Sequence, residues 1–161
     1  MKKSRSLAWD AALSVGENAR RELPALVHEF FAAGRELLAG PAGPADFHAF
    51  RLAAKRFRYT LELFRPLYGR GLEAKLEAVR HIQNLLGRRQ DYEVLGGRLR
   101  LPAQENEALR AALDKCERQG LRLEQEFRAY WLDEFDAAGR ETAWVRYLQP
   151  PPPAVVRTVW T

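Results

Sequence analysis

Apolar residues recur every three or four positions over four stretches of this chain, a spacing that predicts amphipathic helices. The expected helices span residues 7–39 or 17–39, then 47–64, then 72 to 87 or shortly after, and 104–135. No stretch alternates apolar and polar residues as a strand does, and Val and Ile are scarce. The pattern therefore predicts an all-α fold, an antiparallel bundle of about four long helices.

Proline and glycine mark the expected breaks between these helices. Pro24 either kinks the first helix or opens a new one, and residues 40–44 (GPAGP) are a clear breaker. Asp46 is the predicted cap of the second helix. Residues 88–102, which include two adjacent glycines, are expected to be a connection with a short helical turn.

The character of the chain changes after Gly139, where the helical pattern gives way to a proline-rich segment. Residues 149–153 read Gln-Pro-Pro-Pro-Pro, which favours polyproline II. We therefore predict a helical bundle over residues 1–139 and a C-terminal tail over residues 140–161. Three arrangements of the tail stay open: packed on the bundle, docked on a neighbouring chain, or mobile.

The second predicted helix carries a basic stripe beside its apolar stripe. Its members are spaced by three, four and three residues, which places them within an arc of roughly 80° on a helix. No acidic residue lies between Asp46 and Glu62, whereas an ordinary solvated face mixes both signs of charge. The pattern indicates a site for an anion. The basic stripe consists of His48, Arg51, Lys55 and Arg58, and the apolar stripe of Phe47, Phe50, Ala54, Phe57, Leu61 and Phe64.

Charge and composition narrow the classes of function. The net charge is +5, and residues 48–91 alone carry ten Lys or Arg against four acids, so the positive excess is local. No apolar run reaches the ~20 residues that span a bilayer, and residues 1–15 lack the apolar core of a signal peptide. Cys116 has no second cysteine to pair with, and three dispersed histidines do not predict a metal site. We expect a cytoplasmic, single-domain protein without cofactor or metal.

Two motifs resemble those of the CHAD domain, the conserved histidine α-helical domain. The first runs from His48 to Glu62, and the second is an Ile-Gln-Asn-Leu-Leu-Gly segment, residues 82–87, followed by Asp91. The first motif reads His48-x-x-Arg51-x-x-x-Lys55-Arg56-x-Arg58-Tyr59-x-x-Glu62. Together the two motifs place the resemblance over roughly residues 17–131.

The resemblance implies a helical domain that binds inorganic polyphosphate in a basic channel or pocket, without chemistry of its own. It also implies an association with polyphosphate granules. Members of the family usually contain two related helical halves, whereas this chain resembles only the second half. Either one half suffices for binding, or two chains pair as a symmetric homodimer to rebuild the two-half domain.

The candidate polyphosphate-binding residues start with the basic stripe. Arginine presents a planar fork that fits two phosphate oxygens, and Lys55 adds a mobile charge. The alternative is that the stripe only forms ion pairs, with Glu62, Glu73 or Glu77, and that His48 is a capping or surface residue. Four further candidates are Arg56 and Tyr59 at the edge of the stripe, and Lys75 and Gln83 on the opposite wall.

Two other functions compete with polyphosphate binding. An enzyme that transfers or hydrolyses phosphate, with His48 as its reactive group, usually needs carboxylates for Mg²⁺ or a phosphate-cradling glycine loop, and neither pattern is present in the sequence. Non-specific nucleic-acid binding shares the same phosphate chemistry, but no base-reading motif is visible. A vestigial site on a helical scaffold is a third reading. We therefore predict a non-catalytic binding protein with no specific nucleic-acid or membrane partner.

Overall fold

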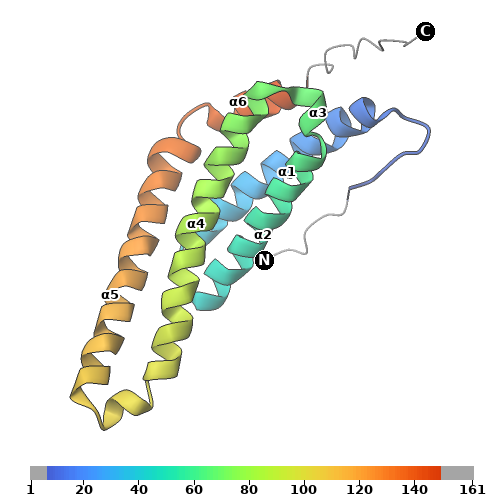
Figure 1. Ribbon diagram of the computed structural model, residues 1–161. Helices are drawn as coiled ribbons and strands as arrows, with labels where there is room; N and C mark the ends of the chain where they lie inside the picture. The colour runs from blue at the N-terminus through green and yellow to red at the C-terminus, as the bar shows by residue number, and fades with distance from the viewer. Residues whose placement is uncertain (1–6, 150–161) are drawn as a thin grey trace.

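The computed structural model describes residues 7–149, and these residues form helices joined by short turns, with no strand among them (Figure 1). The four long helices are α1 (Val15–Leu38), α2 (Pro44–Leu63), α4 (Arg70–Leu99) and α5 (Glu107–Tyr130). The shorter elements are α3 (Arg65–Tyr68), a 3-10 turn (Pro102–Gln104), a π-helical turn (Trp131–Phe135) and α6 (Arg140–Leu148). The predicted all-α bundle is confirmed. No helix within residues 7–149 has both the length and the apolar character needed to cross a membrane.

A long hairpin of α4 and α5 forms one side of the molecule, α2 packs along part of α4, and α1 packs on α2 and α6 (Figure 1). The end of the hairpin that carries the 3-10 turn extends beyond α2. The arrangement leaves α2 in contact with both α1 and α4. The side chains of α2 that lie at the edge of the buried stripe therefore meet α4.

The setting of α2 is fixed by its apolar stripe. All six residues predicted for that stripe are buried, with exposed fractions between 0 and 5 %. The rings of this stripe pack against other aromatic side chains: Phe50 stacks on Phe30 with centroids 5.3 Å apart, and Trp131 meets Phe50 edge-on at 5.4 Å. Burying a Phe or Leu side chain stabilises the fold by about 2 kcal/mol, so the five Phe and Leu residues of this stripe hold the helix firmly. The basic stripe of α2 takes its position from this packing.

The third predicted helix is longer in the structure than the sequence pattern indicates. It was expected to end near Gly87, but α4 continues to Leu99. The glycine pair near its end does not break it. Gly96 is buried against α5, where a Cβ added to it would make ordinary contacts, 3.6 Å from Leu113 Cδ1 and 3.8 Å from Cys116 Cβ. Tertiary packing thus overrides the low helix propensity of glycine.

The predicted cap of the second helix was also displaced. Gly43 is the N-cap of α2, and Asp46 lies in the first turn, where its carboxylate accepts a hydrogen bond of 2.9 Å from the Gly43 N–H. Pro24 lies inside α1 rather than at a helix start. Neither difference moves the apolar or basic stripe of α2.

The bundle extends past Gly139, the boundary expected from the sequence. Helix α6 packs on α1, where Trp144 and Leu148 are buried. The Tyr68 hydroxyl donates to the Leu148 carbonyl (2.9 Å), and the Tyr147 hydroxyl donates to the Tyr68 carbonyl (2.5 Å). The sequence signal was weak because α6 has only nine residues and two buried positions. The four prolines lie outside the described residues.

Candidate functional site

The basic stripe of α2 forms a continuous ridge along one side of the helix, here called the basic ridge: His48, Arg51, Lys55 and Arg58. His48 is exposed, and the other three side chains are partly buried at the edge of the core. The helix repeats every 3.6 residues, so successive members stand about one turn, or about 5 Å, apart. The ridge therefore presents a row of positive groups along α2.

Three members of the ridge meet α4 at successive turns. His48 Nδ1 lies 3.3 Å from Gln90 Oε1, and Arg58 Nε donates a 2.8 Å hydrogen bond to Gln83 Oε1. Between these two contacts, Arg51 crosses Gly87: its Nε would lie 3.7 Å from a Cβ added to that glycine.

The α4 residues in these contacts are spaced by four and three positions, which places them on one face of that helix. The two sequence motifs thus face each other across α2 and α4, with Gln83 and Gly87 of the second motif beside Arg58 and Arg51 of the first. Gln90 was missed by the sequence analysis. Its seven-residue separation from Gln83 is the signal that would have found it.

Two donors at this junction are buried and have no acceptor among the described residues: Arg51 Nε and Gln83 Nε2. A buried donor left without an acceptor costs about 1–3 kcal/mol. The two unsatisfied donors therefore lower the stability of the fold. Such a cost is common where side chains are arranged for binding rather than for the fold.

One member of the ridge, Arg58, forms an ion pair within residues 7–149. The Arg58 guanidinium pairs with Glu62 one turn further along α2, and it also lies over the Tyr59 ring, 4.5 Å from the centroid. Within residues 7–149 neither Arg51 nor Lys55 forms an ion pair. The other two acids considered as partners are engaged elsewhere, Glu73 with Arg65 and Glu77 with Arg80. The alternative of a fully paired stripe is therefore wrong for these residues.

Of the four further candidate residues, some lie at the ridge in the structure and some do not. Tyr59 lies at the ridge, half-exposed, beneath the Arg58 guanidinium. Gln83 lies there too, where it accepts the hydrogen bond of Arg58, whereas Arg56 is exposed. Only Lys75 is placed elsewhere altogether.

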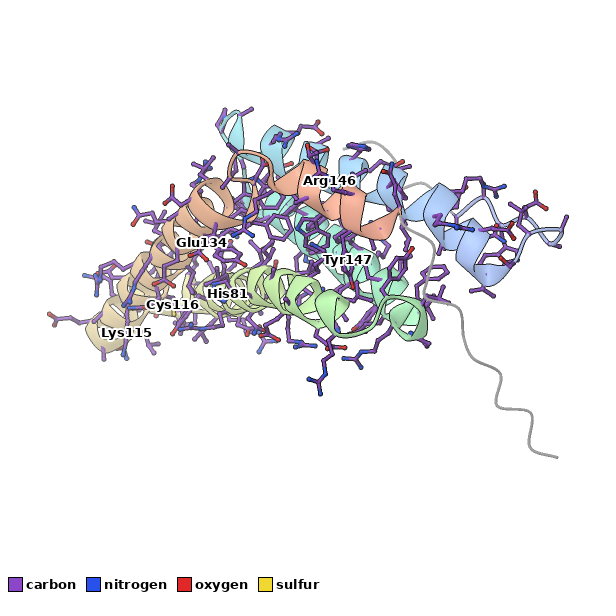
Figure 2. The ribbon with its side chains drawn as sticks, turned by 90° about the horizontal axis from the view of Figure 1, so that it is seen from above. His81, Lys115, Cys116, Glu134, Arg146 and Tyr147 are labelled. Atoms are coloured by element: carbon purple, nitrogen blue, oxygen red, sulfur yellow. The ribbon has the colours of Figure 1, made fainter. Side chains whose placement is uncertain are left out.

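Lys75 faces α6 instead of α2. Its ammonium lies 4.7 Å from the Trp144 ring centroid and 4.9 Å from that of Tyr147, a residue visible on α6 in Figure 2. Burial lowers the pKa of Lys75, and the positive charge of Arg140 lowers it further. The prediction that Lys75 lines the opposite wall of the site was wrong, because an offset of eight residues from Gln83 turns a helical side chain by about 80°.

The fold is an all-α bundle in which a basic ridge on α2 and residues of two short motifs meet across α2 and α4. The chain matches the CHAD domain family over residues 3–100, and it belongs to that family. The match takes in α1 to α4 and ends before α5. CHAD domains are known as polyphosphate-binding domains. No curated protein and no solved structure matches this chain.

Proposed function

We propose that this protein binds inorganic polyphosphate, without catalysis, through the basic ridge and the face of α4 beside it. The observation that carries the proposal is the nature of the groups across α4. Gln83 and Gln90 are neutral amides, so they orient Arg58 and His48 through hydrogen bonds without cancelling positive charge. Basic residues that serve only the fold are usually paired with carboxylates instead.

The spacing of the ridge suits a linear polyanion. Each internal phosphate of polyphosphate carries about one negative charge, and the ridge offers a basic side chain at each helical turn, about 5 Å apart. Arg51 supplies a guanidinium fork for two phosphate oxygens, and Lys55 supplies a compact ammonium. Because neither is engaged in an ion pair within the described chain, both are available for phosphate.

The residues around the ridge support binding rather than phosphoryl transfer. Enzymes of that class stabilise the transferred group with carboxylate-held Mg²⁺ or a glycine-rich loop. Glu62 is the acid at the ridge, and its carboxylate is held by Arg58. Phosphate chemistry through His48 would leave an acid-labile phosphate on the protein after incubation with polyphosphate, and phosphate analysis of the denatured protein measures it. We expect none.

A single added carboxylate tests the role of the amides. Gln90→Glu places a negative charge beside His48, and we expect polyphosphate affinity to fall about fivefold, since a partly exposed ion pair is worth about 1 kcal/mol. Fluorescence anisotropy of labelled medium-chain polyphosphate measures the change. Gln125→Glu, on the exposed side of α5, is the control with the same change in net charge. Equal loss of affinity in both variants would show that only overall charge matters.

The proposal extends to assembly and location. Because family members usually contain two helical halves, we propose that two chains pair symmetrically to rebuild the two-half domain, in the cytoplasm and at polyphosphate granules. Sedimentation equilibrium tests the pairing. The expected mass at high protein concentration is twice that of the 18.4 kDa chain, and a mass that stays at one chain under both dilute and concentrated conditions would rule the dimer out.

A further inference from the structure

A pocket lies between α4 and α5, and Cys116, which is labelled in Figure 2, is one of its lining residues. Its volume is about 260 Å³, slightly below the usual range for drug-sized ligands, so it suits a small molecule. The wall from α4 includes Arg89, Glu93 and Gly96, and the wall from α5 includes Cys116 and Gly120. None of the residues of the basic ridge lines it, so the pocket is separate from the proposed polyphosphate site.

Arg89 is the unusual residue of this pocket. Its side chain is nine-tenths buried, yet two of its nitrogens, Nε and Nη1, donate no hydrogen bond to any described residue. The guanidinium lies over the Phe47 ring, 4.1 Å from the centroid, and its Nε is 3.5 Å from Glu124 Oε2. Glu124 also accepts a hydrogen bond from Arg128, so two arginines share one carboxylate. The buried group therefore keeps an excess of positive charge and unused donors.

Gly120 keeps the α5 wall of the pocket open. A glycine within a helix costs about 1 kcal/mol relative to alanine. A Cβ added at Gly96 would make ordinary contacts with α5, whereas a Cβ added at Gly120 would meet nothing within 4 Å. Gly120 therefore lowers helix stability without permitting a close contact inside the protein. What its missing side chain provides is space in the pocket.

The charges at the rim are of both signs. Glu93 and Glu117 line the pocket and form no ion pair within residues 7–149, and Arg100 lies at the same rim. A simple anion would be repelled by these carboxylates, and a simple cation by the buried arginine. A ligand that carries both charges satisfies both walls.

We propose that the pocket between α4 and α5 binds a small amphoteric molecule. Its carboxylate or phosphate group accepts hydrogen bonds from Arg89 after a small rotation of that side chain, and its ammonium group lies beside Glu93 and Glu117. The aliphatic part of the ligand passes over Gly120. This site is independent of the basic ridge and does not rest on the proposed polyphosphate binding.

Cys116 reports on occupancy, because it is buried in the wall of the pocket and is the single cysteine of the chain. Alkylation of Cys116 by iodoacetamide, followed by intact-mass spectrometry, is measured with β-alanine or phosphoethanolamine as amphoteric probes. Acetate, inorganic phosphate and ethylamine are the probes of single charge. We expect an amphoteric probe to slow alkylation saturably, by about tenfold at ten times its Kd. The amphoteric probe that slows alkylation at the lower concentration identifies the oxyanion of the ligand as carboxylate or phosphate.

A pair of glycine variants localises the effect. Gly120→Leu fills the pocket, so alkylation of Cys116 should be slow from the outset and insensitive to the probes. Gly97→Leu is the matched control, since Gly97 is also helical with open space at its Cβ but does not line the pocket. Circular dichroism confirms that both variants fold.

Three outcomes would overturn the proposal. The first is an alkylation rate unaffected by either amphoteric probe. The second is equal protection by acetate, phosphate or ethylamine, which would remove the need for both charges. The third is that an amphoteric probe slows the alkylation of Cys116 in Gly120→Leu as much as in the unaltered protein, which would place the binding elsewhere. Polyphosphate binding by Gly120→Leu should equal that of the unaltered protein, so failure of this site and failure of the ridge are distinguishable.

Discussion

The triple variant Arg51→Ala/Lys55→Ala/Arg58→Ala is expected to bind labelled polyphosphate about a hundredfold more weakly than the unaltered protein. Each lost phosphate contact at a partly exposed site contributes about 1 kcal/mol, and 1.4 kcal/mol corresponds to tenfold in affinity. The dependence of affinity on salt should also flatten. For single-stranded polyanions the slope of log K against log salt changes by about 0.7 per phosphate neutralised, so three lost contacts reduce it by about 2.

A control of matched charge separates the ridge from general electrostatics. Arg98→Ala/Lys115→Ala/Arg118→Ala removes the same three charges from exposed positions on α4 and α5. This control should bind within about twofold of the unaltered protein, since distant exposed charges are screened. Similar losses in both triple variants would contradict the ridge as the site. An RNA competitor is included: displacement of polyphosphate by RNA at equal phosphate concentration would favour non-specific polyanion binding.

Gly34→Ala should cause the largest loss of stability, about 3 kcal/mol, although alanine is the better helix former. A Cβ at residue 34 would lie 2.1 Å from Trp131 Cζ2 and 2.2 Å from Cη2. The indole is fully buried and is held by the rings of Phe30, Phe50 and Phe135, so it has no space to yield. Thermal unfolding followed by circular dichroism should show a melting temperature lowered by about 9 °C.

The control for this variant is Gly97→Ala, also in a helix but with open space around its Cβ. It should be neutral or slightly stabilising, because alanine gains helix propensity and meets no neighbour. Gly34→Ala/Trp131→Phe should recover part of the lost stability if the overlap with the indole is the cause. A melting temperature of Gly34→Ala equal to that of Gly97→Ala would show that the core adapts to the added methyl group.

The helices were predictable where the apolar pattern is long and strongly periodic. Helix α2 carries five buried positions in 20 residues, which is enough to set its face without any tertiary information. The end of α4 and the whole of α6 could not be predicted from the sequence pattern. At Gly96 the local signal favours a break, whereas in the structure the helix continues with Gly96 buried against α5. In α6, Trp144 and Leu148 are buried because this short helix packs on α1, and the Leu148 carbonyl is bonded to Tyr68 of α3.

The candidate site was predictable in part, for a related reason. The basic ridge follows from spacing within one helix, so it was visible in the sequence. Its partners on α4 depend on how two helices are rotated against each other, which spacing within either helix does not give. Gln83 was found through its motif, Gln90 was missed, and Lys75 was assigned to the wrong neighbour. Arg89 was missed because burial of an arginine has no signature in sequence.

The buried stripe of α2 has a consequence for how the length of this chain can vary. One residue inserted within α2 would turn everything beyond it by about 100°, carrying part of the ridge into the core and part of the phenylalanine row into water. An insertion in the turn at Pro102–Gln104 would shift neither helix face, because that turn lies at the tip of the hairpin. Insertions and deletions are therefore tolerated at the tip and excluded from α2.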